Sequence, residues 1–331
     1  MQFSFPAARV PGRRAFVGLL AAACLAAASP VAFAQTKVTR LVVAFPPGGP
    51  VDFVARTLAE QMGKELGQQV IIENRAGANG AIAAEYVSHA PPDGTTLWLT
   101  SVGAVAINPA LYDKLAYDVQ KDLQPVGLAV RNVEVLVVPA NAPYNTGAEF
   151  IAAARKSGQP LTLASSGTGS VPHLAMELLS DASKTDLLHV PYKGAAPAIT
   201  DVIAGHVNGF FGDIPGLLPF IKTGKLKPIG IAASRRNPLL PEVKTFTEMG
   251  IPGVDSDNWY AVFAGRAVPA ADIEKVSAAL RKALSDETVR SRLAASGAEP
   301  APSTAAELAA LLKQDTDKWT RVVRAKKIKP D

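Results

Sequence analysis

The chain has 331 residues, which suits one large domain or two lobes with a buried core. Hydrophobic residues make up 48% of it and charged residues 19%, and this balance excludes a disordered chain and a coiled coil. The formal net charge is +5, but three of the 34 basic residues, Arg9, Arg13 and Arg14, are the only charges before Gln35. The remaining 31 basic residues nearly balance the 29 acidic ones, which removes the electrostatic argument for binding a nucleic acid.

The first 34 residues are typical of an export signal. Arginines precede the apolar run 15–28, and the small residues of AFA at 32–34 stand where a signal peptidase reads them. This run is shorter than the roughly 18 apolar residues that span a membrane. We therefore expect cleavage after Ala34 and a periplasmic mature protein. The twin arginines at 13–14 also fit a twin-arginine signal, so both that route and the general secretory route stay open.

Cys24 is the only cysteine, and it lies within this signal. It is either removed with the signal or, if AAAC at 21–24 served as a lipoprotein box, it becomes the lipidated N-terminus. In the first case the mature chain has no disulfide and no thiolate nucleophile or metal ligand. Packing alone must then stabilise it.

The mature chain begins with alternating strand and helix patterns. A β-rich run at 39–45 ends in a glycine-rich turn, and apolar residues then recur at helical spacing from Val51 to Leu66. We predict a second strand at 69–72, a short alanine-rich helix at 80–89 and a third strand at 95–100. This βαβαβ order with short connections predicts a parallel sheet covered by helices on both faces.

Two closely spaced apolar runs, 125–130 and 133–138, leave no room for a helix between them, so both are interpreted as strands that carry the chain into a second lobe. There the alternation resumes with a capping box at 146–149. Further strands are predicted at 161–165, 187–190, 207–211 and 226–233, and helices at 171–182, 195–204 and 215–222. A strand at 258–264 and three helices, the last opened by a capping box at 304–307, close the chain.

The predicted fold class is therefore α/β, with two lobes. We assign residues 35–135 and 255–331 to the first lobe and residues 136–254 to the second. Two α/β lobes joined by extended segments predict a cleft between them, where ligands commonly lie at the carboxyl ends of the strands.

Two glycine-rich turns each follow a strand and open a helix. The first is FPPGGPVD at 45–52, and the second is SSGTGSVPH at 165–173. Backbone N–H groups at a helix N-terminus, joined by hydroxyls in the second turn, attract carboxylates or phosphates. One turn from each lobe would close over a small anion, although each could equally be no more than a tight turn.

Nucleotide and catalytic motifs do not fit these turns. The second has Pro172 where a dinucleotide fingerprint needs its last glycine, and the first lacks the Gly-Lys-Ser/Thr of a triphosphate loop. No Gly-x-Ser-x-Gly elbow occurs, and the four histidines, His89, His173, His189 and His206, match no zinc spacing. His173 could assist a hydroxyl nucleophile, but a capping or ligand-contact role suits its place after the second turn better.

Two residues at the ends of predicted strands allow two interpretations each. Asp213 is either a solvated turn residue or a cleft group that favours an ammonium. Trp259 is either part of the core or a stacking platform. The sequence leaves both questions open.

Seven segments, in this order, resemble one known family. They are FPPGGPVDFVAR (45–56), ENRAGANGAIAAEYV (73–87), PPDGTTL (91–97), SSGTGSVPHLAMELL (165–179), VPYKGAAPAITDVIAGHVNGFF (190–211), TGKLKPIGIA (223–232) and the region of Trp259. In these segments the mature chain is similar to the Bug, or TctC-type, solute-binding receptors of tripartite tricarboxylate transporters. The resemblance implies a periplasmic binding protein (Venus-flytrap) fold with a ligand cleft between the lobes.

The resemblance also implies the function. We expect a receptor, not an enzyme, that captures a small carboxylate-bearing solute and delivers it to the permease subunits in the membrane. We expect no cofactor, no metal and no nucleic acid, and a monomeric receptor. The alternatives are a secreted hydrolase that uses a Ser or Thr hydroxyl with His173, and a receptor for an apolar ligand or a signal on the same scaffold.

The family's carboxylate-binding positions map onto both turns and their neighbours. Asp52 is expected to cap its own helix, because a carboxylate facing the ligand would repel an anion. The expected ligand-binding residues are Phe45, Pro47, Gly48, Gly49, Asp52, Asn79, Ser101, Ser166, Gly167, Thr168, Gly169, Ser170, His173 and Ala195, with Asp213 and Trp259 as further candidates.

Overall fold

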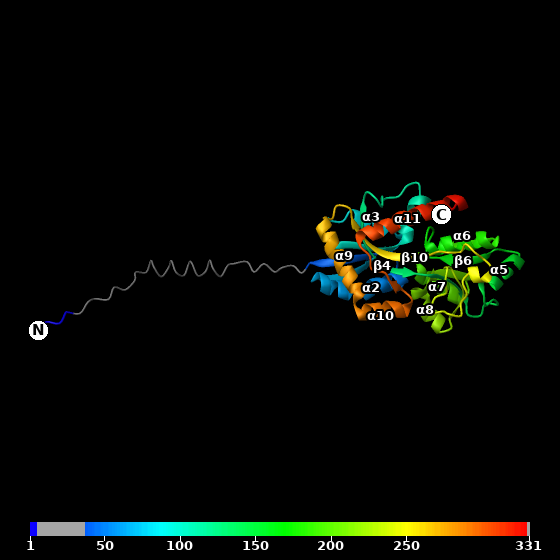
Figure 1. Cartoon of the computed structure of the whole chain (residues 1–331), viewed down its shortest axis with the longest axis horizontal. Coiled ribbons are helices and arrows are strands. Elements are labelled where there is room, and N and C mark those ends of the chain that lie inside the picture. The colour runs from blue at the N-terminus through cyan, green and yellow to red at the C-terminus, as the bar shows by residue number, and fades with distance from the viewer. Residues whose placement is uncertain (5–36, 330–331) are drawn as a thin grey trace. The chain divides into compact units, whose positions relative to one another are not determined.

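The computed structural model describes residues 1–4 and 37–329 (Figure 1). The chain divides into two units, Met1–Thr36 and Lys37–Asp331. From position 5 onward, the predicted export signal lies outside the described residues, and so does its cleavage position after Ala34. Within the two described ranges, none of the helices combines the length and the apolar character needed to cross a membrane. The fold below is that of the second unit.

Six strands form the sheet of the first lobe, in the order β11-β4-β10-β3-β1-β2. β1 runs parallel to β2 and β3, whereas β10 runs antiparallel to β3 and β4. The strands are β1 (Val38–Val43), β2 (Gln69–Asn74), β3 (Thr96–Ser101), β4 (Leu123–Asn132), β10 (Asn258–Gly265) and β11 (Glu299–Pro300). A late strand therefore completes a sheet begun by the N-terminal part of the unit.

Helices cover both faces of this sheet. α2 packs against α9 and α10, while α3 and α11 lie on the opposite side in Figure 1. The helical segments of this lobe are α2 (Pro50–Leu66), η1 (Ala78–Gly80), α3 (Ala81–Ser88), the π-helical turn η2 (Gly103–Ile107), α4 (Asn108–Leu111), α9 (Ala270–Ser285), α10 (Glu287–Ser296) and α11 (Ala305–Lys326).

α2 shows why these segments are helical. Pro50 occupies the first turn, where its missing N–H costs no hydrogen bond. Val54, Leu58 and Met62 then recur at helical spacing and are fully buried. This apolar face fixes the helix on its sheet and places its N-terminus beside the turn that follows β1.

Five strands form the sheet of the second lobe, in the order β7-β6-β8-β5-β9. The strands are β5 (Glu134–Pro139), β6 (Leu161–Ser165), β7 (Leu187–Pro191), β8 (Gly209–Asp213) and β9 (Leu226–Ile231). The helical segments are α5 (Gly147–Lys156), α6 (Val171–Ser183), α7 (Ala195–Ala204), α8 (Ile214–Lys222) and the short η3 (Thr247–Met249). β6 is parallel to β7 and β8, and β5 is antiparallel to β8 and β9.

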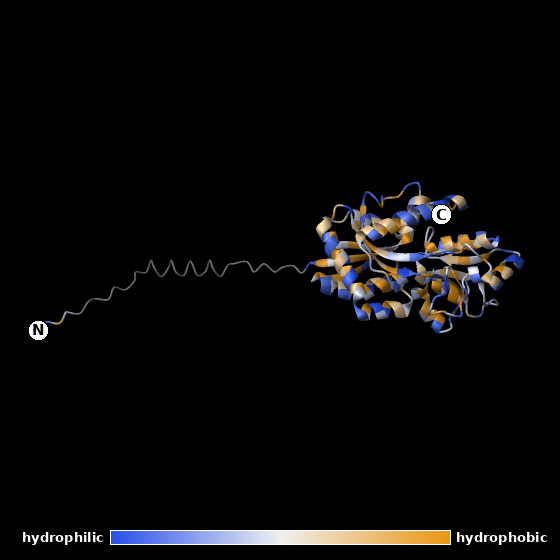
Figure 2. Cartoon of the chain, viewed as in Figure 1, coloured by the Kyte–Doolittle hydropathy of each residue, from blue (hydrophilic) through white to orange (hydrophobic). Residues whose placement is uncertain are grey.

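β5, which lies between β8 and β9 in this second sheet, is buried on both faces. Leu136 and Val138 pack with residues of α5 and α6, whereas Val135 and Val137 pack with residues of α7 and α8. Successive side chains point to opposite faces of a strand, so an unbroken apolar run contributes side chains to two cores, one on each face of the sheet. The helices that surround these cores carry both hydrophilic and hydrophobic residues (Figure 2).

The chain crosses between the sheets twice. The first crossing is at Val133, between β4 and β5, and the second is the segment 232–257, between β9 and β10. Ala232, at the start of the second crossing, donates its N–H to the oxygen of Glu134, the residue that follows Val133, at 2.9 Å, and Ser256, near the end of the second crossing, donates its N–H to Ala232 O at 3.1 Å. Both connections therefore lie side by side where the lobes meet.

The two-lobed α/β fold predicted from the sequence is confirmed. The predicted strand at 207–211 is found at Gly209–Asp213 instead, because Asn208 belongs to the preceding turn, where its side chain accepts from Thr162 N of β6. Thr304 and Glu307 form the complete predicted capping box. At α5 only half of the predicted box forms: Thr146 accepts from Glu149 N, while the Glu149 carboxylate accepts from Asn145 N.

Candidate functional site

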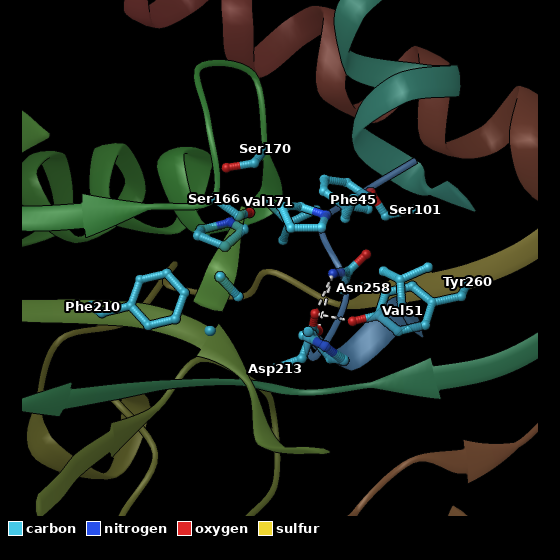
Figure 3. Close-up of a pocket in the computed structure, with 16 residues that line it drawn as sticks. Phe45, Val51, Ser101, Ser166, Ser170, Val171, Phe210, Asp213, Asn258 and Tyr260 are labelled. Carbon is cyan, nitrogen blue, oxygen red and sulfur yellow. Dashed lines mark hydrogen bonds between the residues drawn. The ribbon is translucent and has the colours of Figure 1, made fainter. Parts of the chain in front are cut away.

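A cavity lies where the two lobes meet (Figure 3). Both glycine-rich turns reach it. The predicted site residues that line it are Phe45, Gly49, Ser101, Ser166, Ser170, Ala195 and Asp213. The lining residues that were not predicted as ligand-binding are Pro46, Pro50, Val51, Val171, Pro172, Phe210, Gly212, Asn258 and Tyr260.

Four helices begin at this cavity. Its lining includes the N-terminal residues or caps of α2 (Gly49), α6 (Ser170), α7 (Ala195) and α8 (Asp213). The first N–H groups of a helix have no intrahelical acceptor, and the helix dipole adds positive potential there. Among the described residues that line the cavity, none is a lysine, arginine or histidine. The positive potential at this cavity therefore comes from backbone groups.

The first turn is held from behind by Asp52. This carboxylate is only 3% exposed and accepts from Gly48 N at 3.0 Å, from Arg56 Nε at 2.8 Å and from Asn74 Nδ2 at 2.9 Å. Burial raises the pKa of Asp52, but the hydrogen bonds from these three residues outweigh it and leave the pKa below its ordinary value. Asp52 thus binds the backbone of the turn and does not line the cavity.

The second turn is held by two histidines. Gly169 N donates to His173 Nδ1 at 3.2 Å, and Ser165 Oγ lies 2.6 Å from His189 Nε2. The Ser170 hydroxyl accepts from His173 N and caps α6. Burial, and next the neighbouring His189, lower the pKa of His173 to about 3. His173 is therefore neutral, as it must be for Nδ1 to accept a hydrogen bond.

The end of the cavity opposite Ser170 is acidic (Figure 3). Asp213 ends β8 there and accepts from Asn258 Nδ2 at 3.0 Å and from the Tyr260 hydroxyl. Asn258 and Tyr260 both come from β10, so residues of both lobes meet at this end. Glu134, at the start of β5, is fully buried beside them and shares the Asn258 amide at 3.3 Å.

A second cavity adjoins the first and shares Phe45 and Ser166 with it. Asn79, Gly167 and Thr168 line this second cavity together with Lys193. The Asn79 backbone is left-handed, with φ at 47°, and its amide donates to Asn108 Oδ1 at 2.9 Å. These three predicted residues are thus grouped beside the first cavity.

Several predicted site residues line neither of these two cavities. Trp259 is the clearest case, because successive side chains of β10 point to opposite faces, and Asn258 and Tyr260 take the face toward the cavity. The Trp259 indole instead donates to Asp315 Oδ2 of α11 at 2.6 Å, which makes it a core residue. The other predicted residues outside both linings are Pro47, Gly48, Asp52, Gly169 and His173.

The lobes contact each other around the cavity through glycines. A Cβ atom at Gly194, whose φ is 115°, would lie 2.6 Å from Pro46 Cδ of the other lobe. A Cβ atom at Gly216 in α8 would lie 3.0 Å from Pro50 Cδ. Glycine at both positions lets the second lobe approach the N-terminus of α2.

The arrangement around His173 does not favour the hydrolase alternative. Its Nδ1 accepts from the Gly169 backbone, and its Nε2 lies 3.7 Å from Glu177 Oε1. The ring lies behind the second turn and outside both cavities. Within residues 1–4 and 37–329, no group of three or more His, Cys, Asp or Glu side chains could hold a metal ion.

Comparison with known proteins agrees with this geometry. Residues 54–328 match the model of the tripartite tricarboxylate transporter family receptor, TctC. Three solved structures are similar over nearly their whole length. Periplasmic binding protein BugD is 30% identical, with a TM-score of 0.85 and coverage of 89% of this chain and 99% of BugD.

The other two structures contain ligands. MatC from Rhodopseudomonas palustris with bound malate is 36% identical, with a TM-score of 0.83 and coverage of 87% of this chain and 99% of MatC. R. palustris Rpa4515 with adipate is 30% identical, with a TM-score of 0.86 and coverage of 90% of this chain and all of that chain. The chain therefore belongs to the TctC family of tripartite tricarboxylate transporter receptors, which are periplasmic solute-binding proteins and not enzymes.

Proposed function

We propose that this receptor binds a small carboxylate-bearing solute in the cavity between its lobes and delivers it to the permease subunits of a tripartite tricarboxylate transporter. Two similar structures hold malate and adipate, which are both carboxylates. Delivery to a permease follows from the description of the family as transporter receptors.

The observation that carries the proposal is the meeting of four helix N-termini at one cavity without a basic side chain in its lining. A carboxylate is the solute group that such N-termini attract. We place it between the α2 and α6 ends, where Ser166 and Ser170 can add hydroxyl donors. The complete set of proposed contact residues is Phe45, Gly49, Ser101, Ser166, Ser170, Ala195 and Asp213.

The remaining predicted site residues have a supporting role in this proposal. Asp52 orders the first turn, and His173 orders the second through Gly169. The two lobes, with predicted bounds 35–135 plus 255–331 and 136–254, close on the solute, and binding shifts the population toward the closed form. The receptor acts as a monomer in the periplasm after cleavage following Ala34.

Thermal unfolding of the mature receptor with a panel of carboxylates tests the proposal. A ligand at a hundredfold excess over its Kd stabilises the folded state by about 2.7 kcal/mol, so the Tm rises with concentration for at least one carboxylate. Uncharged analogues of the same size serve as controls. A receptor that no carboxylate stabilises, or that uncharged analogues stabilise equally, contradicts the proposal.

A further inference from the structure

Four buried residues form the acidic end of the cavity, here called the floor: Glu134, Asp213, Asn258 and Tyr260. Glu134 starts β5, Asp213 ends β8, and Asn258 and Tyr260 belong to β10. Each is at most 7% exposed. Asp213, Asn258 and Tyr260 line the cavity, and Glu134 lies behind them.

The hydrogen-bond donors of the floor are already used. The Asn258 amide donates to Glu134 Oε1 at 3.3 Å and to Asp213 Oδ1 at 3.0 Å. Its orientation is set by Trp259 N, which donates to Asn258 Oδ1 at 2.9 Å. The Tyr260 hydroxyl donates to Asp213 Oδ2. A solute therefore finds no free side-chain N–H or O–H in these two residues.

The floor also keeps a negative charge. The carboxyl groups of Glu134 and Asp213 are both buried and share the Asn258 amide, so ionising both would place two like charges close together. Burial, followed by the charge of Asp213, raises the pKa of Glu134 well above its ordinary value, whereas burial raises the pKa of Asp213 only to about 6, so one proton stays on the pair at neutral pH. One proton on two carboxyl groups leaves a charge of about minus one.

Acceptor capacity remains on Asp213. A carboxylate offers about four lone-pair sites, and the donors to Asp213 are Asn258 and Tyr260. A donor from the solute can occupy what is left. A second ionised carboxylate at this place would instead face a like charge with no basic side chain in the cavity lining to offset it.

We propose that the Glu134–Asp213 pair determines specificity at the far end of the cavity, selecting a solute with a carboxylate at one end and an ammonium group at the other, and disfavouring dicarboxylate dianions. This inference rests on the proposed function, because the first carboxylate is placed at the helix N-termini. Asp213 contacts the ammonium, and Glu134 is a positioning residue that holds the Asn258 amide beside Asp213.

Isothermal titration of the mature receptor at neutral pH with two matched series of probes tests this proposal. One series is ω-aminocarboxylates and the other is dicarboxylates of the same chain lengths, from three to six carbons. The best aminocarboxylate is expected to bind at least about tenfold more tightly than the best dicarboxylate, since one like-charge contact costs about that factor or more.

Two isosteric variants separate the roles of the carboxyl groups. Asp213→Asn removes the charge and is expected to abolish the preference for the aminocarboxylate. Glu134→Gln replaces a protonated acid by a neutral amide, keeps the charge on Asp213 and is expected to retain the preference. If Asp213→Asn fails to fold, the relative affinities of the unmodified receptor for the two series still test the proposal.

The outcomes are distinct. A dicarboxylate that binds the unmodified receptor as tightly as any aminocarboxylate overturns the inference while leaving the proposed function intact. An unchanged ranking in Asp213→Asn also overturns it. A receptor that binds neither series, nor any other carboxylate, contradicts the proposed function and this inference with it.

Discussion

The imidazole of His173 stacks on that of His189, with ring centroids 3.8 Å apart and an interplanar angle of 6°. His173 belongs to α6 and His189 to β7, so the pair joins the helix to the strand behind the second turn. Through Gly169 and Ser165, the two rings hold both ends of this turn. His173 thus supports the turn that we propose contacts the solute.

Variants of His173 distinguish a role in supporting the second turn from direct contact with the solute. His173→Ala removes the acceptor for Gly169 N, so the turn loses its geometry, and we expect solute affinity to fall about tenfold, the equivalent of one hydrogen bond. His173→Asn places a side-chain oxygen near the position of Nδ1 and should retain most of the affinity. Titration calorimetry with the best carboxylate measures both. Equal losses in the two variants would show that the acceptor is not what matters.

The same residue gives the stability a pH dependence. The pKa of His173 is about 3 in the folded chain, against an ordinary value of 6.5, so between these values the unfolded chain binds more protons. The free energy of unfolding therefore decreases as pH falls from about 6.5 toward 3, and the contribution is complete above 6.5. Urea unfolding across this range should show a steeper decrease for the unmodified chain than for His173→Asn. Parallel curves would contradict this assignment.

Asp52 should be important for stability and for binding. Asp52→Ala leaves Gly48 N without its acceptor and removes one of the two acceptors of Asn74 Nδ2, and we expect a loss of about 2 kcal/mol in the free energy of unfolding together with weaker binding. Glu60→Ala is the matched control, because Glu60 pairs with Lys64 at the same spacing on α2 but is exposed. Its change should stay within about 0.5 kcal/mol. Similar losses in both variants would argue against a special role of Asp52.

Gly216 should matter for lobe contact more than for folding. Gly216→Ala adds a good helix former to α8, but its Cβ would crowd Pro50 of the other lobe at 3.0 Å. We expect an unchanged or slightly higher Tm without solute and an affinity lowered several-fold. Gly158→Ala, where a Cβ meets nothing within 4 Å, is the control. Full affinity in Gly216→Ala would show that the close contact is not needed for binding.

Most of the strands and helices could be predicted from local patterns in the sequence. The strands and helices followed from periods of two and 3.6, and the two turns from glycines between them. The segment 103–111 was missed because η2 and α4 form a π-helical turn and a four-residue helix, all but two of whose residues are buried, with no polar face to set a period.

The composition of the site was harder to predict than its position. The alternation within β10 could have assigned Tyr260 to the face opposite Trp259, since neighbours on a strand point to opposite sides. The partnership of Glu134, Asp213 and Asn258 could not be predicted, because it joins residues 124 and 45 positions apart through the packing of two lobes. The stacking of His173 on His189 likewise depends on tertiary structure.

The central claim is that a solute carboxylate binds at the N-terminus of α6, and calorimetric titration of Ser170→Ala beside Thr146→Ala tests it most directly. Both changes remove an N-cap acceptor in the second lobe, so each should cost about 1 kcal/mol of stability. Only Ser170 lines the cavity, and only Ser170→Ala is expected to weaken binding of the best carboxylate, by about tenfold. Equal affinity in the two variants, at the affinity of the unmodified receptor, would contradict the claim.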